Sequence, residues 1–262
     1  MRIGLSSASF YPDIFTENSI QKMKDLGFEC GEIFLNSPSE YEDRFASELK
    51  ENAEKLKFDI ISVHAFSSSF EPFLFDRYER RRKDLMKNFS MVCKAASIIG
   101  ARFYTFHGIR LIESKTIGMK FITDIYNELA YRAGEAGILL SQENVSWCMS
   151  SDPEFLQEIK HNCRYPLCFT LDIKQAYKAE RKPEEYIEVM GKDLLNIHIN
   201  DRSEERVCLL PGKGTVDLRE LFGKLKRIDY KGDCIIEVYR ENYSDEKELS
   251  EAREYIKEII NF

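Results

Sequence analysis

Ionisable side chains stand at the ends of short apolar runs along this sequence. The last positions of six such runs include a histidine, an aspartate or a glutamate: His64 in ISVHAF, His107 in YTFHG, Glu143 in LLSQEN, Asp172 in FTLDIKQ, His198 in NIHIND and Glu237 in IIEVY. A carboxylate that follows an apolar strand is costly to bury alone, so it must be paired or bound to a cation. These residues are therefore the first candidates for chemistry.

Four of them form a candidate metal-binding set, namely Glu143, Asp172, His198 and Glu237. They offer three carboxylates and one imidazole, which suit Mn²⁺, Mg²⁺, Co²⁺ or Fe²⁺ better than they suit a thiolate-rich zinc site, although Zn²⁺ remains compatible. The alternative is that the carboxylates form ion pairs with lysine or arginine and that His198 is a core histidine. Because one site would explain all four residues jointly, we expect one divalent cation.

The elements that must position these residues repeat along the chain. Eight apolar runs alternate with longer segments that have helical spacing: RIGLSS, CGEIFL, DIISVH, RFYTFH, ILLSQEN, LCFTLD, LLNIHIN and CIIEVY. Such alternation favours parallel strands with right-handed crossovers, so residues 1–262 are predicted to form a single-domain α/β fold, a (β/α)8 TIM barrel. An open doubly wound sheet is the rival, but SSASFYPD stands where its glycine-rich fingerprint belongs.

The barrel prediction has two consequences. The active site should lie at the C-terminal ends of the strands, where the βα loops converge, so the six strand-end residues should face one bowl. Helices that precede strands should end on glycines in the left-handed conformation, and the candidates are Gly27, Gly100, Gly137 and Gly232.

Four strand-end motifs carry a family resemblance. LLSQEN, LDIKQA, HINDR followed by LPGKGTVD, and IIEVY resemble, in order and spacing, the signatures of the sugar phosphate isomerase/epimerase family, which has xylose isomerase-like barrels. The resemblance spans essentially the whole chain. It implies that Glu143, Asp172, His198 and Glu237 bind a divalent cation, and that His64 and His107 line the same pocket and contact substrate.

The resemblance also implies a reaction. A metal-dependent isomerase or epimerase removes a proton beside the carbonyl of a ketose-like sugar or sugar phosphate, and the cation stabilises the resulting enediolate. Glu143 and Glu237 would be the catalytic acid/base pair, one taking the proton and the other returning it to the opposite face. The partner would be a small carbohydrate or sugar-phosphate substrate, and the resemblance further suggests a homo-oligomer, a dimer or a tetramer.

The sequence departs from the family pattern beside two motifs. Gln175 replaces a histidine common three residues after the sixth-strand aspartate, and it can hydrogen-bond a substrate hydroxyl. Lys213 adds positive charge to the PGKG turn, which favours a phosphate or carboxylate on the substrate. Arg202 and Arg206 are candidates to bind an anionic or hydroxylated substrate, unless they are exposed loop charges. Glu32 is expected to reach the bowl or to pair with a nearby base.

Phenylalanines gather in the segment AFSSSFEPFLFDRYERRRKD, which follows the third apolar run. They are Phe66, Phe70, Phe73 and Phe75. The segment is expected either to form a lid or apolar wall against the carbon face of a sugar, or to pack on its neighbours.

Other functions of the same barrel give different expectations. Endonuclease IV, a multi-zinc nuclease that cuts DNA at abasic sites, shares part of its pattern with His64, His107, Glu143, Asp172 and His198. Gln175 replaces one of its ligand histidines, however, and SEERVCLLPGKG lacks its Asp-x-His pair. A metal-dependent dehydratase of an inositol-derived ketone would use the same ligands as the isomerase. A non-catalytic sugar-binding barrel would be expected to lack one glutamate of the pair, and both are present.

Composition narrows the partners. A net charge of -7 and a pI near 5.4 provide no overall basic field, which disfavours nucleic acid and anionic membranes as partners. The first residues lack the apolar region of a signal peptide, so a cytoplasmic protein is expected. Seven cysteines without a CxxC pair fit reduced thiols in that compartment.

Overall fold

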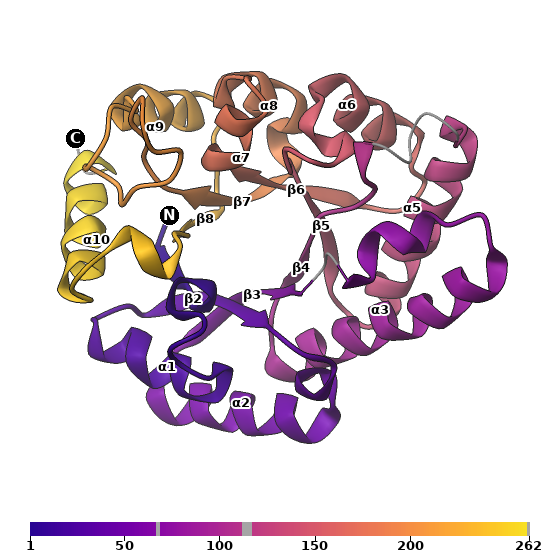
Figure 1. Cartoon of the computed structure of the whole chain (residues 1–262), viewed down its shortest axis with the longest axis horizontal. Coiled ribbons are helices and arrows are strands. Elements are labelled where there is room, and N and C mark those ends of the chain that lie inside the picture. Colours follow the sequence, from indigo (N-terminus) through magenta and orange to yellow (C-terminus); the bar gives the residue numbers. More distant parts are fainter. Residues whose placement is uncertain (67–68, 112–116, 261–262) are drawn as a thin grey trace.

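Eight parallel strands form a closed barrel in the computed structural model, which describes residues 1–66, 69–111 and 117–260 (Figure 1). The strands are β1 (Ile3–Ser6), β2 (Cys30–Leu35), β3 (Asp59–Ala65), β4 (Phe103–Phe106), β5 (Leu139–Glu143), β6 (Leu167–Asp172), β7 (Leu194–Ile199) and β8 (Asp233–Ile236). They follow chain order around the ring, and β8 pairs with β1. The predicted (β/α)8 barrel is confirmed.

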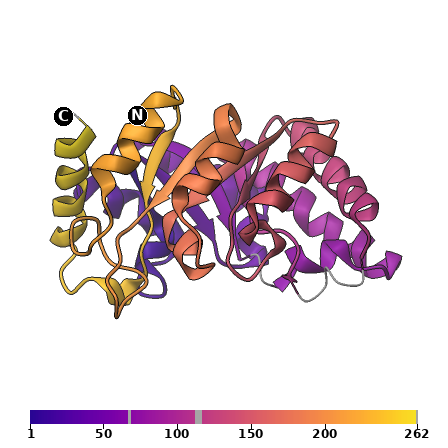
Figure 2. The same cartoon turned by 90° about the horizontal axis from the view of Figure 1, so that it is seen from above.

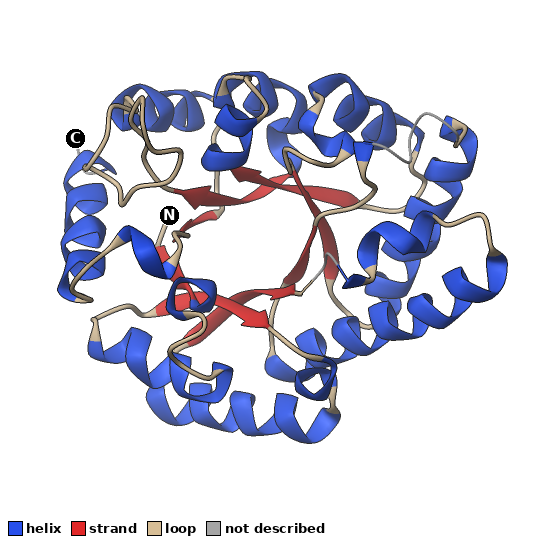
Figure 3. Ribbon diagram, viewed as in Figure 1, coloured by secondary structure: helices blue, strands red, loops and turns tan. Residues whose placement is uncertain are grey.

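Helices surround the strands on the outside of the ring (Figure 3). They are α1 (Thr16–Asp25), α2 (Asp43–Leu56), α3 (Glu79–Ile99), α5 (Met119–Glu135), α6 (Pro153–Asn162), the short α7 (Ile173–Lys178), α8 (Pro183–Met190), α9 (Leu218–Arg227) and α10 (Lys247–Ile260). The C-terminal α10 returns beside the start of the chain, where Ser250 Oγ donates a hydrogen bond of 3.0 Å to the Leu26 carbonyl. Seen from the side, the strands lie inside the layer of helices (Figure 2). In the described part of the chain, no helix is long and apolar enough to cross a membrane.

The main hydrophobic core fills the space between the strands and the helices. On one side of the barrel it is aromatic: Phe89 of α3 is fully buried, with its ring 5.7 Å from that of Tyr104 and 6.0 Å from that of Phe106. Successive residues of a strand point to opposite faces, so Phe106 faces this layer while Thr105 faces the barrel interior. The outward residues of the strands thereby anchor the helices.

The barrel interior is layered. A small apolar cluster of Cys30, Ile61, Phe103 and Ile235 lies near the N-terminal ends of the strands. Above it come buried hydroxyl groups, among them Ser141 and Thr170, which hydrogen-bond each other at 2.7 Å. In β5 and β6 the strand-end carboxylates, Glu143 and Asp172, follow two residues further along. This order places polar support directly beneath the candidate site.

Three of the four predicted glycine positions are left-handed, with φ of 81° at Gly27, 92° at Gly100 and 79° at Gly137. The prediction for Gly232 was wrong, because the left-handed residue of that turn is Asp229, with φ of 56°. Gly232 is required for a different reason. A Cβ atom there would lie 2.1 Å from the Leu195 carbonyl oxygen, so only glycine allows this close approach to β7.

The aromatic layer predicts a large and local stability effect. Phe89→Ala should lower the free energy of unfolding by about 3–5 kcal/mol, because it leaves a cavity among rings that cannot fully collapse. Met91→Ala on the same helix, where the side chain is 39% exposed, should change it by less than about 0.5 kcal/mol. Urea unfolding followed by circular dichroism measures both, and equal losses in the two variants would contradict this description of the core.

Candidate metal centre

The strand-end residues meet at one end of the barrel. Glu143 and Asp172 end β5 and β6, His198 lies one residue before the end of β7, and Glu237 directly follows β8. One ligand atom from each of these four residues lies within 4.8 Å of those from the other three. All four side chains are buried. The structure therefore brings the predicted metal-binding set together.

Hydrogen bonds hold Asp172 in place between β6 and α7. Its Oδ1 accepts a 3.0 Å hydrogen bond from the backbone N–H of Gln175, which caps the N-terminus of α7. The side chain of Asn144 pairs with the backbone of Asp172 in both directions, at 2.6 and 3.0 Å. Burial raises the pKa of Asp172 to about 6, although the nearby Lys174 ammonium acts in the opposite direction. With Oδ1 used as the cap, Oδ2 is left for the cluster.

His198 connects the metal-binding set to a fifth buried residue, Glu32 of β2. Its Nδ1 lies 3.3 Å from both Glu143 Oε1 and Glu237 Oε2, and its Nε2 lies 3.3 Å from the Glu32 carboxylate. That carboxylate also accepts hydrogen bonds from Ser62 Oγ at 2.6 Å and Thr105 Oγ1 at 2.8 Å. The expected pairing of Glu32 with a base is thus observed. When Nε2 of His198 donates its N–H to Glu32, Nδ1 faces Glu143 and Glu237. A carboxylate outside a metal site commonly orients a metal-binding histidine in this way.

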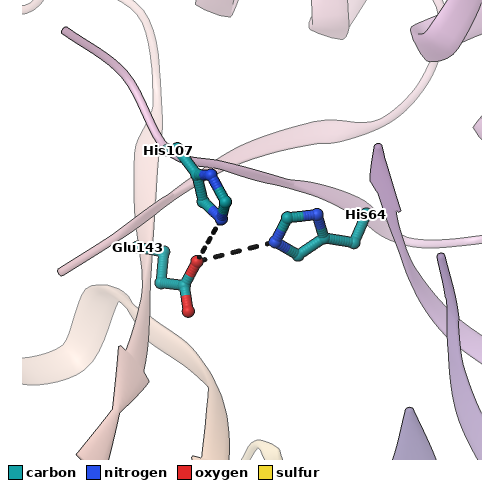
Figure 4. Close-up of side chains that lie close together, drawn as sticks. All are labelled: His64, His107 and Glu143. Carbon is teal, nitrogen blue, oxygen red and sulfur yellow. Dashed lines mark ion pairs between the residues drawn. The ribbon is translucent and has the colours of Figure 1, made fainter. Parts of the chain in front are cut away.

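His64 and His107 both approach Oε2 of Glu143 (Figure 4), whereas His198 approaches Oε1. Their Nε2 atoms lie 3.6 and 3.0 Å from Glu143 Oε2, and their ring centroids are 4.5 Å apart. Nδ1 of His64 is 3.0 Å from the Ala65 carbonyl oxygen, so that nitrogen carries a proton. Burial lowers the pKa of His64, but Glu143 and Glu32 outweigh it and raise the value to about 9. These three residues form a second group of potential ligands that shares Glu143 with the first.

The loop that carries His107 is held from behind by Glu71, which is fully buried. Glu71 accepts hydrogen bonds from the backbone N–H of His107 at 2.7 Å and of Gly108 at 3.3 Å, and from the Tyr104 hydroxyl. This contact could not be predicted, because Glu71 lies in the segment between β3 and α3, away from any strand end. Its carboxylate fixes the backbone from which the His107 ring reaches Glu143.

Lys174 is a further site residue that was not predicted from the sequence. Its Nζ lies 3.0 Å from Glu237 Oε2 and 3.2 Å from Asp172 Oδ2, and the side chain is only 3% exposed. The ion-pair alternative considered from the sequence therefore holds for two of the carboxylates. A lysine in the first turn of a helix is usually exposed, and only its place two residues after a buried strand-end aspartate could have signalled this contact.

The cluster fits a divalent cation. Within the described residues, the buried oxygens Asp172 Oδ2 and Glu143 Oε2 accept no hydrogen bond, although Lys174 Nζ lies 3.2 Å from the first and His107 Nε2 lies 3.0 Å from the second. Buried carboxylate oxygens without hydrogen bonds are costly, and a cation satisfies them. Three carboxylates and one imidazole are also a suitable donor set for Mn²⁺, Mg²⁺, Co²⁺ or Fe²⁺, and Zn²⁺ can use it too.

A cavity of about 340 Å³ opens onto this cluster. Its wall includes the polar residues His64, His107, Glu143, Lys174, Gln175 and Glu237, and the aromatic residues Tyr11, Phe34, Phe66 and Tyr239. Phe66 therefore lies on the wall, whereas Phe70 and Phe75 are buried in the core, and residues 67–68 of that segment are outside the described residues. Such a mixture of apolar faces and convergent polar groups is typical of small-molecule sites.

Three residues that were predicted to contact the substrate differ in whether they line the cavity. Gln175 lines the cavity, and its Oε1 accepts hydrogen bonds from the N–H and hydroxyl of Ser146 at 3.1 and 2.7 Å. The Arg202 guanidinium instead stacks 4.2 Å from the ring centroid of Tyr177. Arg206 is on an exposed loop, and neither arginine is part of the cavity wall. Gln175 thus lines the cavity, whereas the two arginines lie outside its wall.

Comparison with known families agrees with this geometry. The profile of the xylose isomerase-like TIM barrel family matches residues 20–259. The chain belongs to this family. A comparison with curated protein sequences finds no match.

Several solved structures have a similar fold. A D-tagatose 3-epimerase-like protein is 23% identical, with a TM-score of 0.83 over 100% of this chain and 97% of that one. D-psicose 3-epimerase from Clostridium cellulolyticum H10, crystallised with D-tagatose, is 20% identical, with a TM-score of 0.76 over 100% and 98%. An IolI protein with a bound zinc atom is 17% identical, with a TM-score of 0.80 over 100% and 98%. At these identities the likeness establishes the shared fold.

The contact between Glu32 and His198 predicts a change in metal affinity. Glu32→Gln keeps the shape of the side chain but removes the charge that orients the imidazole, so Mn²⁺ affinity should fall by roughly 10–100-fold. Glu29→Gln, just before β2 and largely exposed, should bind Mn²⁺ like the wild type. Calorimetric titration measures the affinities and thermal unfolding checks the fold. Unchanged affinity in folded Glu32→Gln would show that this carboxylate does not support the site.

Proposed function

We propose that this chain is a divalent-metal-dependent sugar or sugar-phosphate isomerase/epimerase that acts on a ketose-like substrate through an enediolate. The observation that carries the proposal is the pair Glu143 and Glu237, two buried carboxylates that line one cavity and share a histidine contact. The named 3-epimerases among the similar structures support ketoses as the substrate class. We assign the catalytic acid/base roles to these two glutamates.

The strand order supports a reaction on two faces of one carbon. Glu143 comes from β5 and Glu237 from the end of β8, and two strands separate them around one side of the ring (Figure 1). Both residues line the cavity, and both carboxylates lie 3.3 Å from His198 Nδ1. A substrate carbon held between them would have one carboxylate on each side, as inversion of a centre requires.

Both glutamates are ionised, the state in which a carboxylate can accept a proton. Burial raises their pKa values, but the three histidines around Glu143 and the cations Lys174 and His198 beside Glu237 reverse this and hold both values well below the usual range. One carboxylate accepts the proton from the substrate carbon and later releases it to solvent, while its partner takes up a proton from solvent and delivers it to the opposite face. The two residues exchange these roles when the reaction runs in reverse.

The other residues bind and orient the substrate. A divalent cation held by Glu143, Asp172, His198 and Glu237 would polarise the carbonyl and stabilise negative charge on the enediolate oxygens. The Nε2 atoms of His64 and His107 point toward Glu143, where they can hydrogen-bond substrate oxygens. The Gln175 amide can bind a hydroxyl, and the aromatic wall excludes water and packs on the carbon skeleton.

One observation favours the nuclease alternative, since His64, His107 and Glu143 form a second potential metal site that shares a carboxylate with the first. The 340 Å³ cavity has the size of a small-molecule site, however, and the chain carries a net charge of -7, which repels a phosphate backbone. A small carbohydrate is therefore the better substrate for this site.

Isotope exchange tests the reaction. With saturating Mn²⁺ and a panel of ketoses and ketose phosphates in D2O, the wild type should exchange the C2 or C3 proton and form the epimer or isomer. Glu143→Gln and Glu237→Gln should each slow exchange by about 10²–10⁴-fold, because each removes an acid/base group. NMR measures exchange and products, and elemental analysis of the same samples separates loss of the base from loss of the metal.

Glu241→Gln provides the matched control, because Glu241 is exposed on the 3-10 turn Arg240–Asn242 after β8. Its exchange rate should equal that of the wild type. Exchange that persists in both glutamate variants would refute the acid/base assignment. Release of water from a keto-inositol would instead indicate the dehydratase, and cleavage of abasic DNA would indicate the nuclease.

A further inference from the structure

Lys174 occupies a place in the cluster where a lysine is energetically unusual. It is the second residue of α7, and its side chain enters the barrel mouth between Asp172 and Glu237, two of the four candidate ligands. Lysine is almost never buried unless it is paired. Lys174 is paired with one oxygen of Asp172 and one oxygen of Glu237. A bound metal would use the same two carboxylates.

The carboxylates need such a cation when no metal is bound. Glu32, Glu143, Asp172 and Glu237 are all at least 92% buried within this one mouth, and like charges at short range oppose ionisation. Histidine nitrogens lie close to the carboxylates of Glu32 and Glu143, whereas the cation closest to the Asp172 carboxylate is the Lys174 ammonium. Without that ammonium, Asp172 and Glu237 would lose their shared counter-charge.

The geometry leaves room for a metal to compete. Glu237 Oε2 accepts a well-formed hydrogen bond from Lys174, whereas the approach to Asp172 Oδ2 is an ion pair without hydrogen-bond geometry. The ammonium also lies 4.8 Å from the ring centroid of Tyr239 and forms part of the cavity wall. It therefore has an alternative position, over the aromatic ring and toward the cavity, if it leaves the carboxylates.

We propose that Lys174 is a tethered cation of the metal centre: its ammonium holds Asp172 and Glu237 in the metal-free protein, and a divalent ion must displace it from these carboxylates in order to bind. The inference rests on the proposed function only in taking these carboxylates as metal ligands. It predicts a barrel that is stable without metal and binds its ion more weakly than the same ligands would alone.

Lys174→Met tests this, because methionine has similar length and no charge. Mn²⁺ binding to the full chain, followed through the electron paramagnetic resonance signal of the free ion, should become at least about tenfold tighter in the variant. The Tm of the metal-free variant should fall by several degrees, since two buried carboxylates lose their partner. The increase in Tm on adding Mn²⁺ should therefore be larger than in the wild type.

Lys178→Met is the matched control, because Lys178 lies one turn further along α7, is exposed, and also contacts Tyr239. It should match the wild type in Mn²⁺ affinity and in metal-free Tm. Unchanged or weaker Mn²⁺ binding by Lys174→Met, or an unchanged metal-free Tm, overturns the proposal. If Lys174→Met does not fold, Lys174→Gln, which keeps an N–H donor for Glu237 but no charge, replaces it with the same expectations.

The two proposals can fail separately. If the wild type and Lys174→Met both bind Mn²⁺ with the expected difference but the wild type exchanges no ketose proton, only the proposed function fails. If neither protein binds Mn²⁺, both proposals fail.

Discussion

The repulsion among four buried carboxylates is the constraint on which the candidate site depends. Glu32, Glu143, Asp172 and Glu237 come from different strands and are almost wholly removed from water. Ions in such surroundings cost several kcal/mol each unless opposite charges and hydrogen bonds compensate. The three histidines and one lysine of the mouth supply part of that compensation, and the oxygens left without hydrogen bonds are where a divalent cation fits.

The closed barrel allows these charged side chains to lie close together. Closure removes every free sheet edge, so eight strand ends can converge without exposing backbone groups. Ser62 and Thr105, one level below the site, donate hydrogen bonds to Glu32, and Glu32 in turn orients His198. Outside the strands, the apolar core fixes the helices and with them the loops that follow each strand. Rigid support of this kind is what a catalytic pair needs.

Much of this arrangement could be predicted from the sequence because it depends on chain order. Parallel strands that alternate with helices place their C-terminal ends together, so the convergence of Glu143, Asp172, His198 and Glu237 followed from their positions alone. Contacts across the barrel depend instead on side-chain direction. The Lys174 ammonium could have pointed to solvent, and the Arg202 guanidinium lies over the ring of Tyr177, outside the cavity. Gly232 was needed for a close approach to β7, which no local pattern reveals.

The most direct measurement of the central claim is metal stoichiometry. Elemental analysis after equilibrium dialysis against Mn²⁺ should find one ion per chain in the wild type and almost none in Asp172→Asn, whose folding thermal unfolding would verify. A crystal structure of the loaded protein should show that ion among Glu143, Asp172, His198 and Glu237. Absence of a bound ion, or two to three zinc ions per chain that include His64 and His107 as ligands, would contradict the single-cation centre proposed for this barrel.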